Sequence, residues 1–394
     1  MTIFPKIEQI TRDATLSHFF LMFGYKLFSI YFPLFLVSKN FSLHQIGYTN
    51  FLIYLPMALF APIAGYLSHR INLAVLSALG IAGYGIYALG MIIFPTNFTF
   101  YLFQIVLGIS AALFFVSSRA MLMGSKLESY DRAFAWFYSA NSYAAAISPA
   151  IGALIIWRFG FIGVFVLSLV LQFFNAIFFF RRFKKQVTHL PDNIKIGESV
   201  KNYFSSLGKI KNKNNSPFIL ISFLVLILAG FNNTFFVLYL KNLGMSQSQI
   251  LIFNSLLNLV FLPTSLWVIK WVSKFRSEIN VSWGSQVAGF FSFLLGGFYS
   301  IMNFYTVFVV TLGNYIGSLI ADSGRSGLLS RKLKDHTEES AAIDTIFSPL
   351  ATSIGAVIGG LIIGPLGYPL IFVGFGALLF GSGFFTRIFT KSGN

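Results

Sequence analysis

Long apolar stretches alternate with short polar connections along most of the chain. A membrane-spanning helix needs about 20 mainly apolar residues. We expect twelve such spans, at residues 14–37, 46–67, 73–95, 98–123, 133–157, 161–180, 217–240, 250–272, 279–301, 304–329, 341–364 and 367–389. The strands of a membrane barrel would instead alternate over about ten residues. Helices are the other way to satisfy the backbone in lipid, so the pattern predicts an all-α polytopic membrane protein.

Composition excludes an ordinary soluble protein. Hydrophobic residues make up 56% of the chain and charged residues 10%, whereas about a quarter of the residues in a soluble domain are charged. The chain contains no cysteine, which excludes disulfides, thiol catalysis and cysteine-bound metal. Residues 1–13 have mixed charge and precede an apolar stretch too long for a signal-peptide core, so we expect the first span to be retained.

One long basic stretch, residues 181–216, lies between six predicted spans and six more. We therefore expect an N-terminal six-helix bundle at 1–180, a cytoplasmic linker at 181–216 and a C-terminal six-helix bundle at 217–394.

The distribution of basic residues predicts the orientation. With both termini in the cytoplasm, 24 of the 28 basic residues lie on the inner side or at inner helix ends, whereas Lys39, Arg158 and Lys241 lie outside and Lys26 lies within a span. The positive-inside rule therefore favours a multi-pass protein of the cell (plasma) membrane with cytoplasmic termini. The net charge of +16 is spread over several loops that face one leaflet. This arrangement favours contact with anionic headgroups of the lipid bilayer over a nucleic-acid partner.

The two halves resemble each other at an offset of about 205 residues, where residues 31–46 align with residues 235–250. The aligned pairs include Ser42 and Ser246, Gln45 and Gln249, Arg119 and Arg325, and Gly152 and Gly359. Repeats of this kind are typical of transporters whose substrate site lies between the halves near the middle of the membrane.

Two short segments add a family resemblance. Residues 65–70 read GYLSHR and residues 147–152 read ISPAIG. The first is similar to the G-x-L-a-D-R signature of the major facilitator superfamily, and the second to its glycine- and proline-rich segment in helix 5. The resemblance implies two pseudo-symmetric six-helix bundles that work by alternating access. The chain departs from the family at His69, where the signature has Asp, and at Gln104, where proton-coupled drug antiporters usually have Arg.

Two ionisable residues inside spans have no charged counterpart in the other half. Lys26 aligns with Gly230, and Asp322 aligns with Val116. A charge within a span is costly and is therefore a candidate for function. Helical spacing places each on a polar face, one formed by His18, Met22, Lys26, Ser29 and Pro33 and the other by Asn314, Ser318, Asp322 and Arg325.

The resemblance implies that both faces line a central cavity. Lys26 would then bind an anionic group of the cargo or act as the counter-ion of Asp322. Asp322 would carry coupling protons or bind a cationic group. The alternatives are a snorkelling lysine and a local ion pair between Asp322 and Arg325.

Other polar residues divide into two groups. Candidates for cargo binding are Ser29, Gln104, Asn141, Asn233, Asn314 and Ser318, although each could equally bond a neighbouring helix. Candidates for gating or structure are His69, Arg70, Arg119, Arg325 and Asp344. In the family the signature Asp meets the start of helix 11, so we expect His69 or Arg70 to meet Glu338, Glu339 or Asp344 there when the cytoplasmic side is closed.

These features predict a monomeric secondary transporter of a small organic solute, with an anionic solute and proton coupling through Asp322 as options, and no cofactor. An enzyme is disfavoured because the five histidines are scattered and no HExxH, GxxxxGK or G-x-S-x-G motif is present. A flippase or exporter of lipids or amphiphiles on the same fold remains the alternative, and it would need a cavity open sideways to the membrane.

Overall fold

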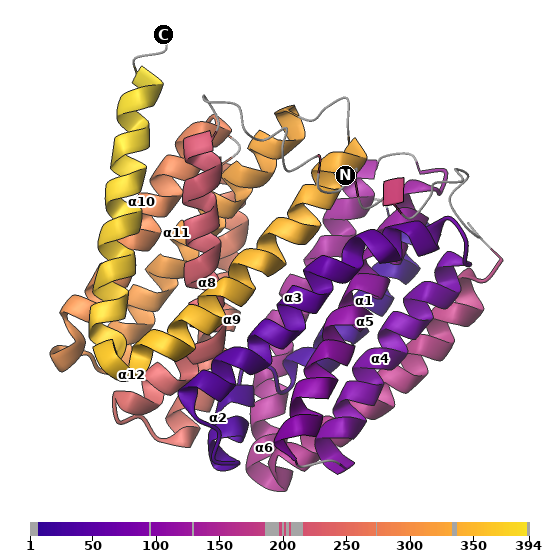
Figure 1. Cartoon of the computed structure of the whole chain (residues 1–394), viewed down its shortest axis with the longest axis horizontal. Helices are drawn as coiled ribbons and strands as arrows, with labels where there is room; N and C mark the ends of the chain where they lie inside the picture. Colours follow the sequence, from indigo (N-terminus) through magenta and orange to yellow (C-terminus); the bar gives the residue numbers. More distant parts are fainter. Residues whose placement is uncertain are drawn as a thin grey trace. The chain divides into compact units, whose positions relative to one another are not determined.

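The computed structural model describes residues 7–93, 96–127, 130–185, 197–198, 201, 205, 216–272, 274–332 and 337–391. These residues form helices and no strand (Figure 1). The α-helices are α1 (Gln9–Lys26), α2 (Phe32–Ser38), α3 (Leu43–Ser68), α4 (Leu73–Ile93), α5 (Asn97–Met123), α6 (Tyr130–Phe183), α8 (Ser216–Asn242), α9 (Gln247–Val272), α10 (Ser277–Gly297), α11 (Phe304–Lys332) and α12 (Thr337–Lys391), with a 3-10 turn η1 (Tyr299–Ile301).

Eight helical segments of the described residues are long and apolar enough to span a membrane. The two longest, in α6 and α12, are each interrupted by one glycine with a positive φ. Gly160 has φ 69° and Gly367 has φ 71°, a conformation that glycine adopts without steric cost. The second arm of α12 turns away sharply and leads to the C-terminus (Figure 1). The expectation of twelve crossings stays a prediction.

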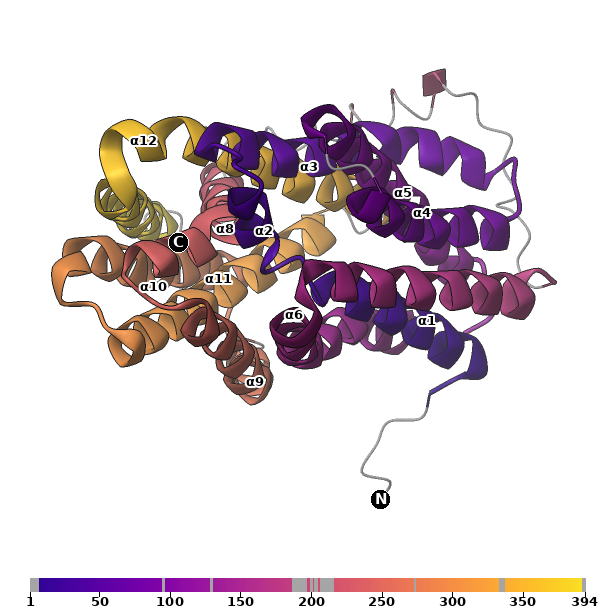
Figure 2. The same cartoon turned by 90° about the horizontal axis from the view of Figure 1, so that it is seen from below.

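The chain divides into two compact units, Met1–Ile30 with Leu55–Lys201 and Tyr31–Tyr54 with Asn202–Asn394. Within the first unit, α1 packs along α6, and α4 packs against α5 and α6 (Figure 2). Within the second unit, α8 packs along α12, and α10 packs against α11 and α12. Because these helices correspond in the sequence repeat, both units use the same packing scheme.

Local structure supports the same repeat. The backbone N–H of Ser42 donates to Gln45 Oε1 at 2.8 Å, and the N–H of Gln45 donates to Ser42 Oγ at 3.3 Å. Ser246 and Gln249 make the same two bonds at 2.9 and 3.3 Å. Both pairs are capping boxes that satisfy free N–H groups at a helix start, here of α3 and α9. Residues that align in the sequence repeat thus cap equivalent helices.

The segment 31–54 packs within the second unit. The hydroxyl of Tyr31 donates to the carbonyl of Leu251 at 3.4 Å, and α2 packs against α8. Gly47 lies directly against Ala356 and Gly360 of α12, where a side chain would collide with the backbone. The helix α3 therefore begins in the second unit and ends in the first.

Candidate functional site

The first predicted span is not one continuous helix. α1 ends at Lys26 and α2 begins at Phe32. Pro33 has no N–H, and its ring clashes with the carbonyl four residues earlier, that of Ser29, in a helix. The N–H groups of Leu27 and Ser29 still bond back to Phe23 and Tyr25, both at 3.1 Å. The chain then leaves the helix.

The expectation of an unbroken helix over 14–37 is therefore wrong. Pro33 aligns with Val237 in the second half, where α8 continues without a break. Ser29 and Pro33 lie beyond the end of α1, so they do not continue the helical face of His18, Met22 and Lys26. The break is a feature of the first half alone.

Lys26 is the last residue of α1 and is half-buried. The C-terminal end of a helix carries partial negative charge, which favours a cation there. Among the residues that the structure describes, the side-chain ammonium of Lys26 has no hydrogen-bond or ion-pair partner. Breaks in membrane helices are typical positions of substrate and ion sites in transporters. The position of Lys26 is thus suited to binding a transient anion.

Polar bonds hold α1 in place up to the break. Ser17 Oγ donates to Asn175 Oδ1 at 2.7 Å, and Asn175 Nδ2 donates to the carbonyl of Ser17 at 3.0 Å. One turn further on, Gln172 Nε2 donates to the carbonyl of Leu21 at 3.0 Å. Sequence reasoning did not select Gln172 and Asn175, although their spacing of three residues inside an apolar span was a usable signal.

Aromatic packing surrounds the residues beside Lys26. Phe28 lies 4.9 Å from Phe165 and 5.9 Å from Tyr87, measured between ring centroids. Gln104 is fully buried, and its Nε2 donates to the hydroxyl of Tyr87 at 3.4 Å. Gln104 therefore forms a hydrogen bond to this aromatic cluster. The cluster packs against one side of the helix break that follows Lys26.

His18 and Arg119 lie among aromatic rings in the same unit. His18 is buried, its Nδ1 is 2.7 Å from the carbonyl of Phe137, and its ring packs on that of Phe137 at 4.4 Å. The guanidinium of Arg119 lies 5.3 Å from the ring centroid of Tyr138. Both arrangements are those of residues that stabilise helix packing.

Asp322 forms the local ion pair with Arg325. The distance from Arg325 Nη1 to Asp322 Oδ1 is 3.7 Å, and the Arg325 side chain is only 7% exposed while that of Asp322 is 39% exposed. A buried guanidinium needs a nearby anion, and Asp322 supplies one. The coupling role of Asp322 stays a prediction beside this structural one.

The remaining candidates in the second unit differ in exposure. Asn314 is buried, and its Nδ2 donates to the carbonyl of Ala288 at 2.9 Å and to Ser292 Oγ at 3.0 Å. Asn232 Nδ2 donates to Asn314 Oδ1 at 3.4 Å, so Asn314 joins α8, α10 and α11. Ser318 is half-buried and Asn233 is exposed, as is Asn141 in the first unit.

Comparison with protein families decides the broader identity. The family model described as Major Facilitator Superfamily matches residues 14–338. The chain belongs to the major facilitator superfamily. A comparison with curated protein sequences found no significant match.

Solved transporters of the major facilitator superfamily share the fold over nearly the full chain. A POT family transporter in complex with a thioalcohol-conjugated peptide has a TM-score of 0.79 at 14% identity, covering 97% of this chain and 96% of that one. A POT family transporter in complex with 5-aminolevulinic acid has a TM-score of 0.78 at 15% identity, with 97% and 96% covered. The nucleoside transporter NupG has a TM-score of 0.75 at 14% identity, with 96% and 99% covered.

Family membership and fold establish a multi-pass membrane protein that works as a secondary transporter rather than as an enzyme. Among the described residues, no group of three His, Cys, Asp or Glu side chains could hold a metal ion.

The structure describes the superfamily signature at residues 65–70, at the end of α3, but not the side chains expected to meet it. His69 is half-buried, and Arg70 is exposed with its guanidinium 5.8 Å from the ring centroid of Tyr66. The side chains of Glu338, Glu339 and Asp344 lie outside the described residues. The gate contact expected between these groups therefore stays a prediction.

Proposed function

We propose that this chain moves a small organic solute with an anionic group across the cell membrane by alternating access, and that Lys26 binds that group. The observation that carries the proposal is Lys26 at the end of α1, half-buried beside a helix break. A charge within a membrane costs about 2.5–3.5 kcal/mol on insertion scales, and the partial negative charge at the end of α1 offsets only part of that cost. Lys26 therefore needs an anion in some state of the cycle, and the cargo supplies it.

The structural relatives support an organic cargo. One of the POT family structures contains 5-aminolevulinic acid, a small molecule with a carboxylate. A carboxylate is a good partner for a lysine ammonium, because charge-assisted hydrogen bonds are stronger than neutral ones. We take small carboxylates as the first class to test.

Asp322 is proposed as the site of proton coupling. Its carboxylate is partly exposed and lies 3.7 Å from Arg325, so protonation would remove the anion beside a buried cation. The resulting loss of attraction would favour a rearrangement of α11, which is what coupling requires.

A binding screen followed by transport tests the proposal. The purified chain is screened by thermal shift against anionic, zwitterionic, cationic and neutral solutes, at one pH below and one above neutrality. Uptake of the best ligand is then measured in proteoliposomes. We expect Lys26→Met to abolish uptake and Lys39→Met, which removes an exposed cation near the same break, to preserve it.

Two results would count against the proposal. Uptake that survives in Lys26→Met would remove the role of Lys26. Translocation of a labelled phospholipid by the same proteoliposomes, without uptake of any solute, would favour the flippase.

A further inference from the structure

A groove of about 670 Å³ runs between α4 and the second arm of α6 in the first unit. Small residues form its floor, among them Ala78, Ala82 and Ala176, and larger exposed side chains such as Ile86 and Phe173 form its rim. The groove is apolar except at one end, where Arg181 and Lys184 line it. It is separate from the surroundings of Lys26.

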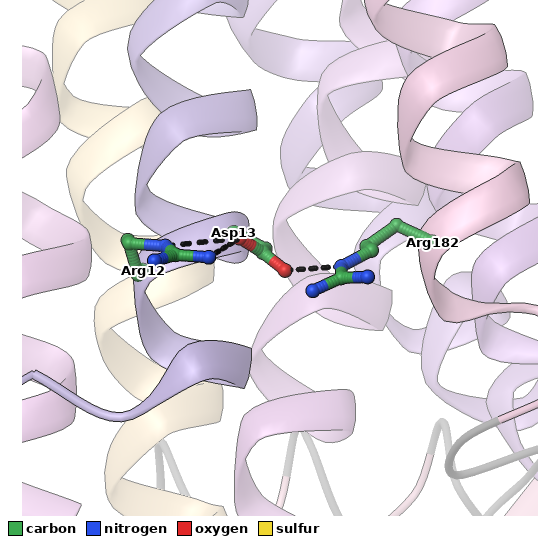
Figure 3. Close-up of polar contacts among 3 residues, drawn as sticks. All are labelled: Arg12, Asp13 and Arg182. Atoms are coloured by element: carbon green, nitrogen blue, oxygen red, sulfur yellow. Dashed lines mark hydrogen bonds and ion pairs between the residues drawn. The ribbon is translucent and has the colours of Figure 1, made fainter.

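The basic end is built by helical spacing. Arg181 and Lys184 are three residues apart near the end of α6, so they lie on one face, and both are exposed. Arg182, between them, points elsewhere and pairs with Asp13 of α1 (Figure 3). Among the groove-lining residues that the structure describes there is no acid. The two cations are therefore available to an anion in the groove.

The start of α4 lies at the same end. Asn72 Nδ2 donates to the carbonyl of Lys184 at 3.3 Å, and Asn72 also caps α4 by accepting from the N–H of Ala74 at 2.9 Å. The N-terminal end of a helix carries partial positive charge. This charge adds to that of Arg181 and Lys184.

The groove is longer than the hydrocarbon depth of one leaflet. The lining residues of α4 extend from Val75 to Leu89, which is about 21 Å at about 1.5 Å per residue. One leaflet contributes half of a hydrocarbon core of about 30 Å. A tail that starts at the basic end would therefore remain in the groove through its whole leaflet.

We propose that this groove is a specific site for an anionic phospholipid, with the phosphate between Arg181 and Lys184 and one acyl chain along α4 and α6. Charge complementarity selects the occupant, since a zwitterionic headgroup would bring its own cation to a cationic end. The leaflet is the one that meets the end of α6, which our orientation places on the cytoplasmic side.

Native mass spectrometry of the purified full chain tests the site. The protein is titrated with phosphatidylglycerol and with phosphatidylcholine of identical acyl chains. We expect the first phosphatidylglycerol molecule to bind at least about fivefold more tightly than the first phosphatidylcholine. This ratio is the effect of one basic residue near an anionic headgroup. Arg181→Gln/Lys184→Gln should remove this preference, and Arg181→Lys/Lys184→Arg should retain it.

Two further variants separate this site from general charge effects. Lys126→Gln/Lys274→Gln removes two exposed cations elsewhere and should leave the preference unchanged. Ala82→Leu fills the floor and should weaken binding of both lipids. No preference in the parent protein, an equal loss in both glutamine double variants, or unchanged binding in Ala82→Leu would overturn the proposal. The melting temperature of each variant in lipid-free detergent confirms that it is folded.

Discussion

Asn40 and Gly244 adopt the same left-handed backbone conformation at equivalent positions of the repeat, with φ of 62° and 83°. Each lies just after the end of a helix. Backbone N–H groups of the residues that follow the helix donate to carbonyls in its last turn. The N–H of Phe41 donates to Leu36 at 3.1 Å, and that of Met245 donates to Leu240 at 3.3 Å. This is the pattern of a Schellman helix end.

The first prediction concerns these two turns. Gly244→Asn should be nearly neutral, because Asn40 shows that asparagine is accommodated in this conformation. Gly244→Val should lower stability by about 1–2 kcal/mol, since its β-branched side chain, unlike that of asparagine, fits poorly at positive φ. The melting temperatures of the two variants measure the difference. Equal melting temperatures would mean that the turn is not held in this conformation.

The second prediction concerns the contact between α1 and α6. A side chain at Gly152 would collide with the carbonyl of Leu27, and overpacking costs about 1–3 kcal/mol. Gly152→Ala should therefore lower the melting temperature. Gly381→Ala is the control, because nothing lies within 4 Å of a Cβ there and alanine favours helix. A Gly152→Ala protein as stable as the control would contradict the close packing.

The third prediction concerns the ion pair between Asp13 and Arg182 (Figure 3). Asp13 is nearly buried and also lies 3.3 Å from Arg12 Nε, whereas the Arg182 side chain is 38% exposed. Because water screens Arg182, we expect Asp13→Asn to cost only about 1 kcal/mol. The loss should shrink at high salt. The exchange Asp13→Arg/Arg182→Asp should recover part of it, and a double variant no better than Asp13→Asn would exclude a specific pair.

The fourth prediction concerns Lys26 and Asp322. If both charges serve one transport cycle, Lys26→Met and Asp322→Asn should each abolish uptake, and the double variant should lose less than the two losses combined. Purely additive losses, or normal uptake in either single variant, would leave Asp322 as the partner of Arg325. The melting temperature of Asp322→Asn separates a coupling defect from simple loss of that ion pair.

The fifth prediction concerns orientation. The chain has no native thiol, so a single introduced cysteine reports its own position. In intact cells, a membrane-impermeant maleimide should label Lys241→Cys and should leave Ser205→Cys unlabelled until the cells are opened. Labelling of Ser205→Cys from outside would reverse the predicted topology.

The helical class and the repeat followed from sequence because each depends on local chemistry. Apolar length predicted helices in lipid, and the Ser42–Gln45 and Ser246–Gln249 pairs are capping motifs within one turn. The break after Lys26 was also local, since Pro33 was visible, but a proline is often tolerated in membrane helices. Only the structure showed that the chain leaves the helix after Ser29, whose own N–H still bonds back to Tyr25.

The polar candidates were harder to predict because their roles depend on packing. Asn314 was selected by helical spacing and Gln104 as an uncharged polar residue within a span. Both are buried and hydrogen-bonded to neighbouring side chains, and their part in cargo binding stays a prediction. Asn141 and Asn233 are exposed, although nothing in their local sequence distinguishes them from the buried Asn314. Spacing gives the face of a helix, and the neighbouring helix decides what that face contacts.

The packing of residues 31–54 with the second unit has a consequence for biosynthesis. These residues leave the ribosome before α8, which begins at Ser216, and at about 5–20 residues per second the delay is about 10–30 s. During that time Leu251, which accepts the hydrogen bond of Tyr31, and Ala356 and Gly360, which lie against Gly47, have not yet been made. Lipid, the insertion machinery or a chaperone must cover residues 31–54 until synthesis of α12 is complete.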